Sequence, residues 1–388
     1  MNAANEGQQP PSAPDIHAEY RELRANRPVS RDGDGPWLVA YYEDVRDILK
    51  AHDVYSSEVS QRLREEGTPP SMLFSDPPIH SRLRGLVNRA FTPKQIAMQT
   101  APIEKRCRAL VERLASTDRA DLMSGLAAPL PVGVIATMLG VEDGDFDAFK
   151  RWSDVIFGNI GEILIGTPSE EAVAAAAEMD AYFLQRIAEL RVTPRSHLLS
   201  GLVHVETEDG RLTDAEVLMF CRLLLIAGNE TTTSLIVGCA RVFHEIPESF
   251  GHLKRSPELI PSFVEETLRY HSPFKMTIRR ALRDVELRGE HIAQGDLVVP
   301  LIASANRDER VFERADEFVI DRHPNQHLAF GLGIHSCLGA ALARLEGRIA
   351  VAALLEHLDG ISFANFDAAE LDAFAAPATV PVDLRRAA

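Results

Sequence analysis

Cys337 is the residue of this sequence with the most specific chemical setting. It lies in the glycine-rich segment 330–339, FGLGIHSCLG, and an apolar helical run follows directly. We expect the cysteine to open this helix, where the helix dipole lowers the pKa of a thiol and favours the thiolate as a metal ligand. Three glycines allow a tight loop with room for a flat cofactor: Gly331, Gly333 and Gly339. The segment therefore predicts a thiolate-ligated metal in a large planar group.

A structural zinc site is the main alternative for the same segment. Four residues of ligand type stand close together in the chain: His323, His327, His335 and Cys337. Their spacing, however, differs from that of the common zinc signatures. A dinucleotide-binding fingerprint is incomplete as well, because Ser336 stands where its third glycine is required.

A second candidate group, AGNETTT at 227–233, interrupts a long apolar segment. Each residue after the alanine is a poorer helix former or costlier to bury than leucine, and such exceptions tend to mark function. A carboxylate next to a hydroxyl, Glu230 and Thr231, could pass protons into a cavity. The same residues could instead form a solvated polar notch or a helix kink. A kink can arise because a threonine hydroxyl can donate to a carbonyl one turn earlier.

The element that must position this pair is a helix predicted over 212–246. Thr213 and Glu216 form the pattern of a capping box at its start, and Pro247 ends it. More than thirty residues at 1.5 Å each give about 50 Å, enough to cross the whole molecule. Charged and polar residues interrupt its apolar runs, so no stretch is long enough to span a bilayer. We expect a buried central helix.

The rest of the chain divides into helical and β-rich regions. Helical periodicity dominates residues 101–250. Between 276 and 299 the pattern changes to short β-rich runs separated by Gly289 and Gly295, as in small sheets. We expect a mainly α fold with small β-sheets (α+β), with a disordered tail over 1–14 and a single helix-rich domain over 15–388.

The bulk composition narrows the classes of function. The 388 residues carry a formal net charge of -16, which repels nucleic-acid phosphates and anionic lipid surfaces. The four cysteines lack the spacing of a disulfide framework, and the first residues, MNAANEGQQPPSAP, lack the features of a secretory signal. We expect a cytoplasmic protein with no nucleic-acid partner and no membrane span.

Together, these motifs resemble those of the cytochrome P-450 family of haem-thiolate monooxygenases. Segment 330–339 matches the family's haem-binding signature at each defining position. The stretch 227–232 resembles its oxygen-activation stretch, and Glu266-x-x-Arg269 resembles its structural ion pair. The resemblance extends over nearly the whole chain. It implies the cytochrome P-450 fold, a single large domain with the long central helix over the haem.

The resemblance also implies a cofactor, haem b, and a co-substrate, O2. Cys337 would be the axial ligand of the iron, and this thiolate favours cleavage of the O–O bond. Glu230 and Thr231 would be catalytic, because that cleavage needs protons. The residues implied to hold the haem and its propionates are His80, Arg84, Arg279, Phe330, Gly331, His335 and Gly339.

Two of the motifs have simpler explanations. Glu265 and Arg269 stand four residues apart, so a surface pair worth roughly 0.3 to 0.5 kcal/mol would give the same letters. His80 and Arg84 share one face of a helix, where such side chains are usually just solvated.

The sequence departs from the family's pattern at one visible place. Glu317 stands where many relatives have an arginine against the Glu–Arg pair. Arg314 or Arg322 could substitute for it, and the sequence does not decide between them.

By the same resemblance, the substrate pocket is mostly apolar. A neutral hydrophobic substrate follows, such as a terpenoid, steroid, fatty or polyketide-like molecule. Lys275 is expected to face solvent or a backbone carbonyl, because side chains alternate in an extended segment. If it faced the pocket instead, an acidic substrate would be favoured. The implied lining residues are Met72, Leu73, Phe74, Ile156, Phe157, Ile160, Ile163, Phe220, Leu224, Ala227, Phe274 and Met276.

The implied reaction inserts one oxygen atom of O2 into this substrate. The sequence shows no flavin-binding pattern, so a separate ferredoxin with its reductase would supply electrons. A peroxide-driven peroxygenase and a non-catalytic haem sensor are alternatives, although neither needs the Glu230–Thr231 pair. An acidic ferredoxin requires a basic patch on its partner. A local excess of cations suits that role: Arg82, Arg89, Lys94, Lys105, Arg106 and Arg108.

Overall fold

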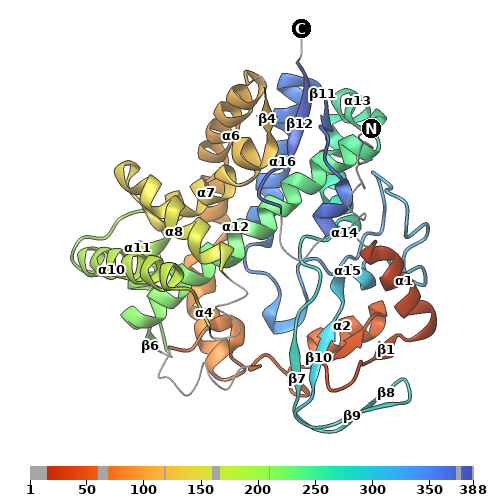
Figure 1. Ribbon diagram of the computed structural model, residues 1–388. Helices are drawn as coiled ribbons and strands as arrows, with labels where there is room; N and C mark the ends of the chain where they lie inside the picture. The colour runs from red at the N-terminus through yellow and green to blue at the C-terminus, as the bar shows by residue number, and fades with distance from the viewer. Residues whose placement is uncertain are drawn as a thin grey trace, which may run out of the picture.

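The fold has a large helix-rich part and a smaller part built around a mixed sheet (Figure 1). The computed structural model describes residues 15–59, 69–117, 119–159, 167–208, 210–372 and 377–386. The tail expected over 1–14 lies outside these described residues. The expectation of a mainly α fold with small sheets is confirmed.

The helix-rich part is formed mainly by the middle of the chain and by one helix near its end. Its helices are α4 (Ile79–Ala90), α5 (Pro93–Met98), α6 (Thr100–Ala115), α7 (Pro129–Leu139), α8 (Phe146–Gly158), α10 (Glu170–Val192), α11 (Leu198–His204), α12 (Asp214–Glu245), α13 (Glu248–Arg255), α14 (Ile260–Tyr270) and α16 (Ala340–His357).

The main sheet brings together strands from residues 29–56 and 279–300, which are far apart in the chain. Its strand order is β1 (Val29–Ser30), β2 (Trp37–Val39), β10 (Leu297–Pro300), β7 (Arg279–Ala281) and β3 (Tyr55–Ser56). Only β2 and β10 pair in parallel, with Val299 opposite Leu38, and the other pairs are antiparallel. The helices α1 (Ile16–Asn26), α2 (Tyr42–Lys50) and α15 (Ile302–Ala305) pack beside this sheet.

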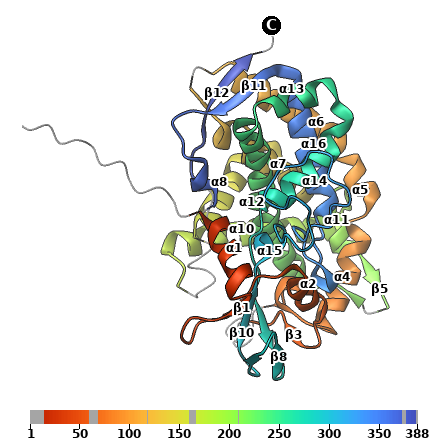
Figure 2. The same ribbon diagram turned by 90° about the vertical axis from the view of Figure 1, so that its right-hand side faces the viewer.

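Smaller sheets lie at the margins of the molecule. They are β8 (Val285–Leu287) with β9 (Glu290–Ile292), β5 (Glu206–Thr207) with β6 (Gly210–Arg211), and β11 (Leu358–Phe363) with β12 (Pro381–Arg386) and β4 (Ala120–Asp121). Seen from the side, β8 and the pair β11–β12 lie at opposite ends of the molecule (Figure 2). Gly289 and Gly295 adopt φ values of 87° and 93°, which favour glycine, so the β-rich runs end where predicted.

The long helix α12 matches the helix predicted over 212–246. Its capping box is complete, because Glu216 N donates to Thr213 Oγ1 at 3.2 Å and Thr213 N donates to Glu216 Oε2 at 2.8 Å. It packs against α7, α10, α14 and α16. Among the described helices, α12 alone has the length and composition of a membrane span. Its packing on several neighbours is that of a core helix.

Glu266 and Arg269 on α14 form an ion pair in which both side chains are fully buried. Arg269 Nε and Nη2 donate to the two carboxylate oxygens at 2.8 and 2.7 Å. Arg322 adds a second guanidinium, with Nε 3.0 Å from Glu266 Oε1. Further hydrogen bonds come from Val319 N and Asn325 Nδ2. Every charge here has several partners, which a buried ion pair requires.

The remaining acidic and basic residues of this region pair elsewhere. Arg314 binds Glu317 at the surface, so Arg322 is the residue that completes the buried network. Glu265 does not pair with Arg269. It accepts a hydrogen bond from Arg344 Nε at 2.7 Å, and its Oε2 lies 3.1 Å from His327 Nε2. The surface-pair explanation of this motif is therefore wrong.

Replacing Arg269 with alanine should lower the free energy of unfolding by roughly 3 to 5 kcal/mol, because Glu266 would stay buried with fewer partners. Arg314→Ala is a matched control, since the Arg314–Glu317 pair is 57% and 59% exposed. Its removal should cost at most about 1 kcal/mol. Urea unfolding of both variants tests this. Equal losses of unfolding free energy in the two variants would show that the buried pair contributes no more to stability than the exposed pair does.

Candidate active site

The loop around Cys337 is closed by backbone hydrogen bonding and by close contact with α2. Cys337 N donates to Phe330 O at 2.8 Å. Gly331 and Gly333 have φ values of 62° and 76°, in the region that favours glycine. A Cβ added at Gly333 would meet Leu49 O at 2.6 Å, so no larger residue fits there.

Cys337 stands just before a helix and does not open it. The N-cap of α16 is Gly339 and its first residue is Ala340. The N–H groups of these two residues donate toward the Cys337 sulfur. The glycine also leaves space, because a Cβ at Gly339 would lie 3.9 Å from that sulfur. The sulfur therefore receives two amide donors at the start of α16.

The pKa of the Cys337 thiol is raised, contrary to our expectation. Desolvation by the surrounding protein is the largest effect, and it exceeds the opposing effects of the amides and of Arg84 and Arg344. Cys337 is nevertheless an exposed residue, unlike the three other cysteines. Binding of a metal cation deprotonates a coordinating thiol outright, so this pKa does not weaken the case for ligation.

Arg84, Arg279, His80 and His335 form a cationic cluster near this loop. Arg84 Nη2 donates to Ser336 O at 2.9 Å, and Arg279 Nη1 donates to Ile278 O at 2.8 Å. The two imidazole rings are 4.3 Å apart. Burial and the neighbouring cations lower the pKa of His335 to about 3. The cluster thus places the guanidinium groups of Arg84 and Arg279 beside neutral histidines.

Several ring nitrogens of the cationic cluster have no hydrogen-bond partner among the described residues. Both ring nitrogens of His80 and Nε2 of His335 are buried without one. Burial also lowers the pKa of Arg84 and of Arg279. A buried polar atom without a partner is costly, so such a cluster fits a ligand that brings anionic oxygens. The two propionates of haem have that chemistry.

Apolar surfaces near the site suit a flat hydrophobic group. Ala227 is exposed although it lies in the middle of the core helix α12. Leu73 and Phe274 are each 45% exposed. The ring of Phe330 is covered by Arg344, whose guanidinium carbon lies 4.3 Å from its centroid. With the thiol and the cationic cluster, these features fit haem b.

The polar stretch of α12 contains both structural and cavity-lining residues. Asn229 Nδ2 donates to Ser153 Oγ at 2.9 Å, and Thr233 Oγ1 donates to Ala127 O at 3.0 Å, both in buried positions. Thr231 Oγ1 donates to Ala227 O at 2.8 Å, one turn earlier. Such a bond from a threonine to the preceding turn was the alternative explanation of this motif, as the mark of a helix kink. However, α12 continues through the motif as helix.

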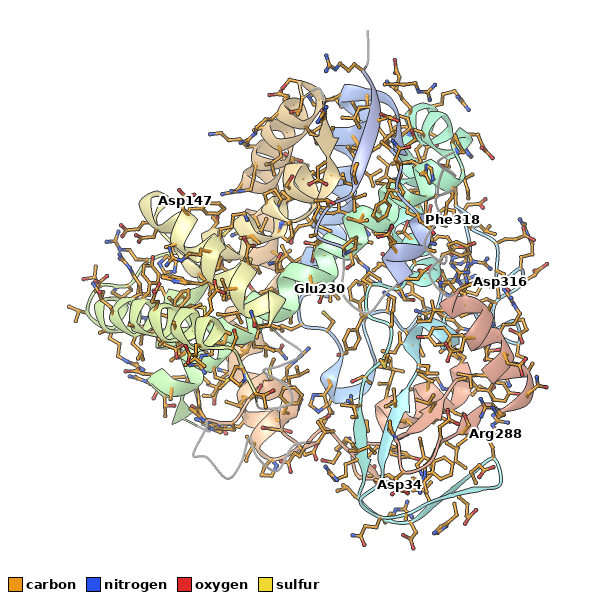
Figure 3. The ribbon with its side chains drawn as sticks, in the orientation of Figure 1. Asp34, Asp147, Glu230, Arg288, Asp316 and Phe318 are labelled. Carbon is orange, nitrogen blue, oxygen red and sulfur yellow. The ribbon has the colours of Figure 1, made fainter. Side chains whose placement is uncertain are left out.

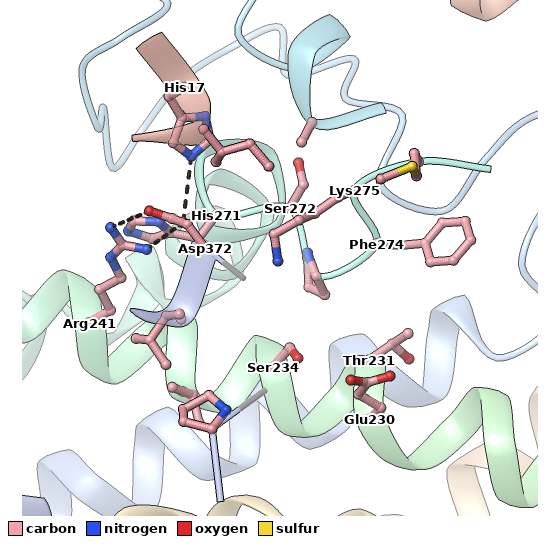
Figure 4. A pocket seen from close by; sticks show the side chains of 18 of the residues that line it. His17, Glu230, Thr231, Ser234, Arg241, His271, Ser272, Phe274, Lys275 and Asp372 are labelled. Atoms are coloured by element: carbon pink, nitrogen blue, oxygen red, sulfur yellow. Dashed lines mark hydrogen bonds and ion pairs between the residues drawn. The ribbon is translucent and has the colours of Figure 1, made fainter. Parts of the chain in front are cut away.

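Glu230 lies near the middle of the molecule (Figure 3). With Thr231 it lines a cavity between α12 and the segment that follows α14 (Figure 4). Phe274 lies across from Thr231 in this view. Polar residues that the sequence did not single out lie at its other end: His17, Arg241, His271 and Asp372. They come from α1, from α12, from the end of α14 and from the short helix Ala368–Asp372. Their separation in the chain hides this grouping from sequence patterns.

Lys275 lines the same cavity as Glu230, although it was expected to face solvent or a backbone carbonyl. Burial lowers the pKa of its ammonium group, whereas Asp372 and Glu230 oppose that change. The alternation rule fails because residues 272–278 form no strand, and β7 begins only at Arg279.

The predicted pocket residues differ in their surroundings. Phe274 and Met276 line the cavity with Glu230. Met72, Ile156, Phe220 and Leu224 are buried members of the main apolar core, which accounts for their hydrophobic character. Phe74 is partly buried beside Met72, in a short helix, Met72–Phe74. The side chain of Phe157, and Ile160 and Ile163 as a whole, lie outside the described residues.

The cations predicted to form a docking patch differ in their surroundings. Arg82 pairs with Glu216 at 2.6 Å. Arg106 lies over the ring of Phe146, with its guanidinium carbon 5.3 Å from the centroid. The exposed members are Arg89, Lys94, Lys105 and Arg108. The exposed basic group is therefore smaller than the sequence suggested.

Sequence comparison places this site in a known family. The family model described as Cytochrome P450 matches residues 255–361, which include Glu266, Arg269 and Cys337. The chain is 39% identical over 358 residues to the putative cytochrome P450 YjiB of Bacillus subtilis (strain 168), covering 88% of each protein. It is 39% identical over 357 residues to the cytochrome P450 monooxygenase PikC of Streptomyces venezuelae, covering 89% of this chain and 84% of that protein.

Solved structures give the same assignment. Cytochrome P450 CYP109Q5 from Chondromyces apiculatus has a TM-score of 0.88 at 36% identity, with 96% of each chain covered. CYP109E1 from Bacillus megaterium in complex with testosterone has a TM-score of 0.84 at 37% identity, covering 96% of this chain and 98% of that chain. The protein belongs to the cytochrome P450 family and is a cytochrome P450 monooxygenase.

Proposed function

We propose that the protein inserts one oxygen atom of O2 into a neutral, hydrophobic small molecule, using electrons from a separate ferredoxin and its reductase. The observation that carries the proposal is the joint presence of a glycine-lined thiol, Cys337, and an acid–alcohol pair, Glu230 and Thr231. A haem sensor needs only the thiol, and a peroxide-driven enzyme does not need the pair. The proposed site of action is the cytoplasm.

Haem b would bind through Cys337 and would supply the binding and reductive activation of dioxygen. The cationic cluster would neutralise its propionates, whose charges would otherwise be costly to bury. Phe330, Gly331 and Gly339 would contact the flat cofactor near the thiolate. These roles follow from the donors and apolar surfaces that surround the loop.

Proton delivery would fall to Glu230 and Thr231. The Thr231 hydroxyl now donates to Ala227 O, so it must release that carbonyl to donate elsewhere. Its oxygen can accept a replacement proton at the same time, because a hydroxyl is both donor and acceptor. Glu230, the preceding residue and a wall of the same cavity, would supply that proton from the solvent side.

The substrate class is proposed from the lining and from relatives. Phe274 and Met276 give the cavity apolar walls beside Glu230 and Thr231. One similar structure, CYP109E1, was solved with testosterone and with corticosterone. A curated relative is a mycinamicin IV hydroxylase/epoxidase. Lys275 also lines the cavity, but the carboxylates of Asp372 and Glu230 already act on its charge, so no acidic group is required of the substrate. We therefore propose a steroid-like or polyketide-like substrate. For the electron donor, the exposed cations Arg89, Lys94, Lys105 and Arg108 are the proposed contacts.

Replacing Cys337 with alanine should abolish the red-shifted carbonyl band of the reduced protein, because that band requires thiolate ligation. Cys107→Ala is the matched control, since Cys107 is a buried core thiol on α6. Difference spectra of both variants with carbon monoxide test this. Survival of the band in Cys337→Ala would refute the ligand assignment.

Thr231→Ala should bind substrate normally but divert electrons to peroxide. Loss of one proton-transfer group typically costs about 10² to 10⁴-fold in rate. Thr231→Ser keeps the hydroxyl and should retain coupling. The measurement is product and peroxide formed per electron consumed, with ferredoxin as donor. Unchanged coupling in Thr231→Ala would exclude this residue from proton delivery.

Arg279→Leu should weaken haem retention by about 10- to 100-fold, because a hydrogen bond to a charged group contributes about 1.5 to 3 kcal/mol. Arg280→Leu is the control, because adjacent side chains of a strand point to opposite faces. The rate of haem transfer to an excess of a haem-scavenging protein measures the effect. Equal rates in the two variants would rule out a propionate contact by Arg279.

A further inference from the structure

We propose that the end of the cavity formed by α1 and the helix Ala368–Asp372 is a subsite for a neutral hydrogen-bonding group of the substrate, a hydroxyl or a carbonyl, and that the His17 imidazole is its contact. The inference rests on the proposed function and deepens it, because it adds one polar group at a defined end of a hydrophobic substrate. The carbon that is oxidised then lies at the other end, near Thr231.

The cavity follows one face of α12. Thr231, Ser234 and Arg241 all line it, and their intervals of three and seven residues place them on the same side of the helix. Ten residues at 1.5 Å each separate Thr231 from Arg241 by about 15 Å along the axis. In Figure 4, Thr231 lies across from Phe274 at one end, whereas Arg241 lies beside Asp372 at the other. The cavity therefore has an apolar wall near Thr231 and a separate polar end.

His17 is held at the polar end because α1 is anchored. Asp15 caps this helix, since its carboxylate accepts from His17 N at 3.0 Å and from Ala18 N at 3.2 Å. The side chain of Arg24 is 1% exposed, and its Nη1 donates to Ser304 O of α15 at 3.2 Å. A side chain on an anchored helix can present a hydrogen-bonding group at a defined place.

The His17 ring has unused hydrogen-bonding capacity. Its Nδ1 is buried without a partner among the described residues. Its Nε2 lies 3.8 Å from Asp372 Oδ1, which is too long for a hydrogen bond. The side chain is 12% exposed, so it is not sealed from the cavity that it lines. Because an unsatisfied buried polar atom is costly, the ring suits a ligand that brings a hydrogen-bonding group to it.

The histidines at this end are neutral at physiological pH. Burial is the largest effect that lowers the pKa of His17 to about 2, and Arg307 is the next. Burial likewise lowers the pKa of His271 to about 4. A neutral imidazole has one donor and one acceptor nitrogen, so it can bind a hydroxyl or a carbonyl. It offers no charge that would attract an ionised group.

The charged groups at this end already face opposite charges. Asp372 accepts hydrogen bonds from Arg241 Nη1 at 2.7 Å and Nη2 at 3.1 Å, and Arg241 Nε donates to Glu245 at 2.6 Å. The carboxylates of Asp372 and Glu230 also act on the charge of Lys275. An ionised ligand must compete with these partners, whereas a neutral ligand leaves them in place. The polar end therefore favours a hydroxyl or a carbonyl over a carboxylate or an amine.

Three ligands that share one alkyl chain test the end group: dodecane, dodecanol and dodecanoate. In equilibrium dialysis of the holoprotein, His17→Phe and His17→Leu should weaken dodecanol binding about 2- to 12-fold, the effect of one net hydrogen bond. Dodecane binding should not change, which also shows that the cavity is intact. His17→Gln keeps a donor and an acceptor and should bind dodecanol as the wild type does. His291→Phe is the matched control, since the His291 side chain is 59% exposed on β9.

Equal changes in dodecane and dodecanol binding in both apolar variants would overturn the inference, because the ring would then only pack or bind water. Stronger binding of dodecanoate than of dodecanol to the wild type would overturn the neutral class.

The position of oxidation is the second readout. The wild type should oxidise dodecanol in the half of the chain away from its hydroxyl, and His17→Phe should spread the products over more positions. A wild-type product oxidised next to the hydroxyl would contradict the proposed orientation. Failure of the wild type to form product would instead contradict the proposed function, and the dialysis result would still decide the subsite.

Discussion

The buried carboxylate of Glu266 organises both sides of the active site. It binds Arg269 and Arg322, and Arg269 in turn donates to Asn306 O at 2.9 Å. The side chain of Asn306 then bonds in two directions. Its Nδ2 donates to Ser272 Oγ, at the start of the cavity segment, and its Oδ1 accepts from Leu328 N, just before the Cys337 loop. One connected set of hydrogen bonds therefore fixes the cavity wall and the thiolate loop together.

Desolvation shifts the pKa values of several residues in and around the active site. It raises the pKa of the Cys337 thiol and lowers those of His335 and Lys275. Each of these groups lies where a ligand, a metal or an opposite charge restores what burial removes. In contrast, the core thiol Cys239 is buried, and burial raises its pKa to about 12 against the opposing effect of a hydrogen bond with Thr267. A buried group in the site therefore differs from a buried core thiol in the groups that surround it, and not in how deeply it is buried.

Local patterns predicted the fold's elements well, because their causes are local. The capping box of α12, the glycine turns around β8 and β9, and the tight Cys337 loop all depend on residues close in sequence. Long-range choices were not predictable. Arg322, rather than Arg314, reaches Glu266 across 56 residues. Lys275 and Asp372 are far apart in the chain, yet both line one cavity. The polar stretch of α12 shows the same limit, since Asn229 and Thr233 are anchors whose partners lie on other helices.

The parallel pairing of β2 with β10 has a consequence for biosynthesis. Residues 37–39 must wait for residues 298–300 before they can form their ladder. At a ribosomal rate of about 5 to 20 residues per second, that delay is roughly 13 to 52 s for each chain. Cys337, the proposed iron ligand, emerges later still, after the partner strand. The nascent N-terminal strands therefore need protection from wrong pairing, and cofactor capture is a late event in the maturation of the chain.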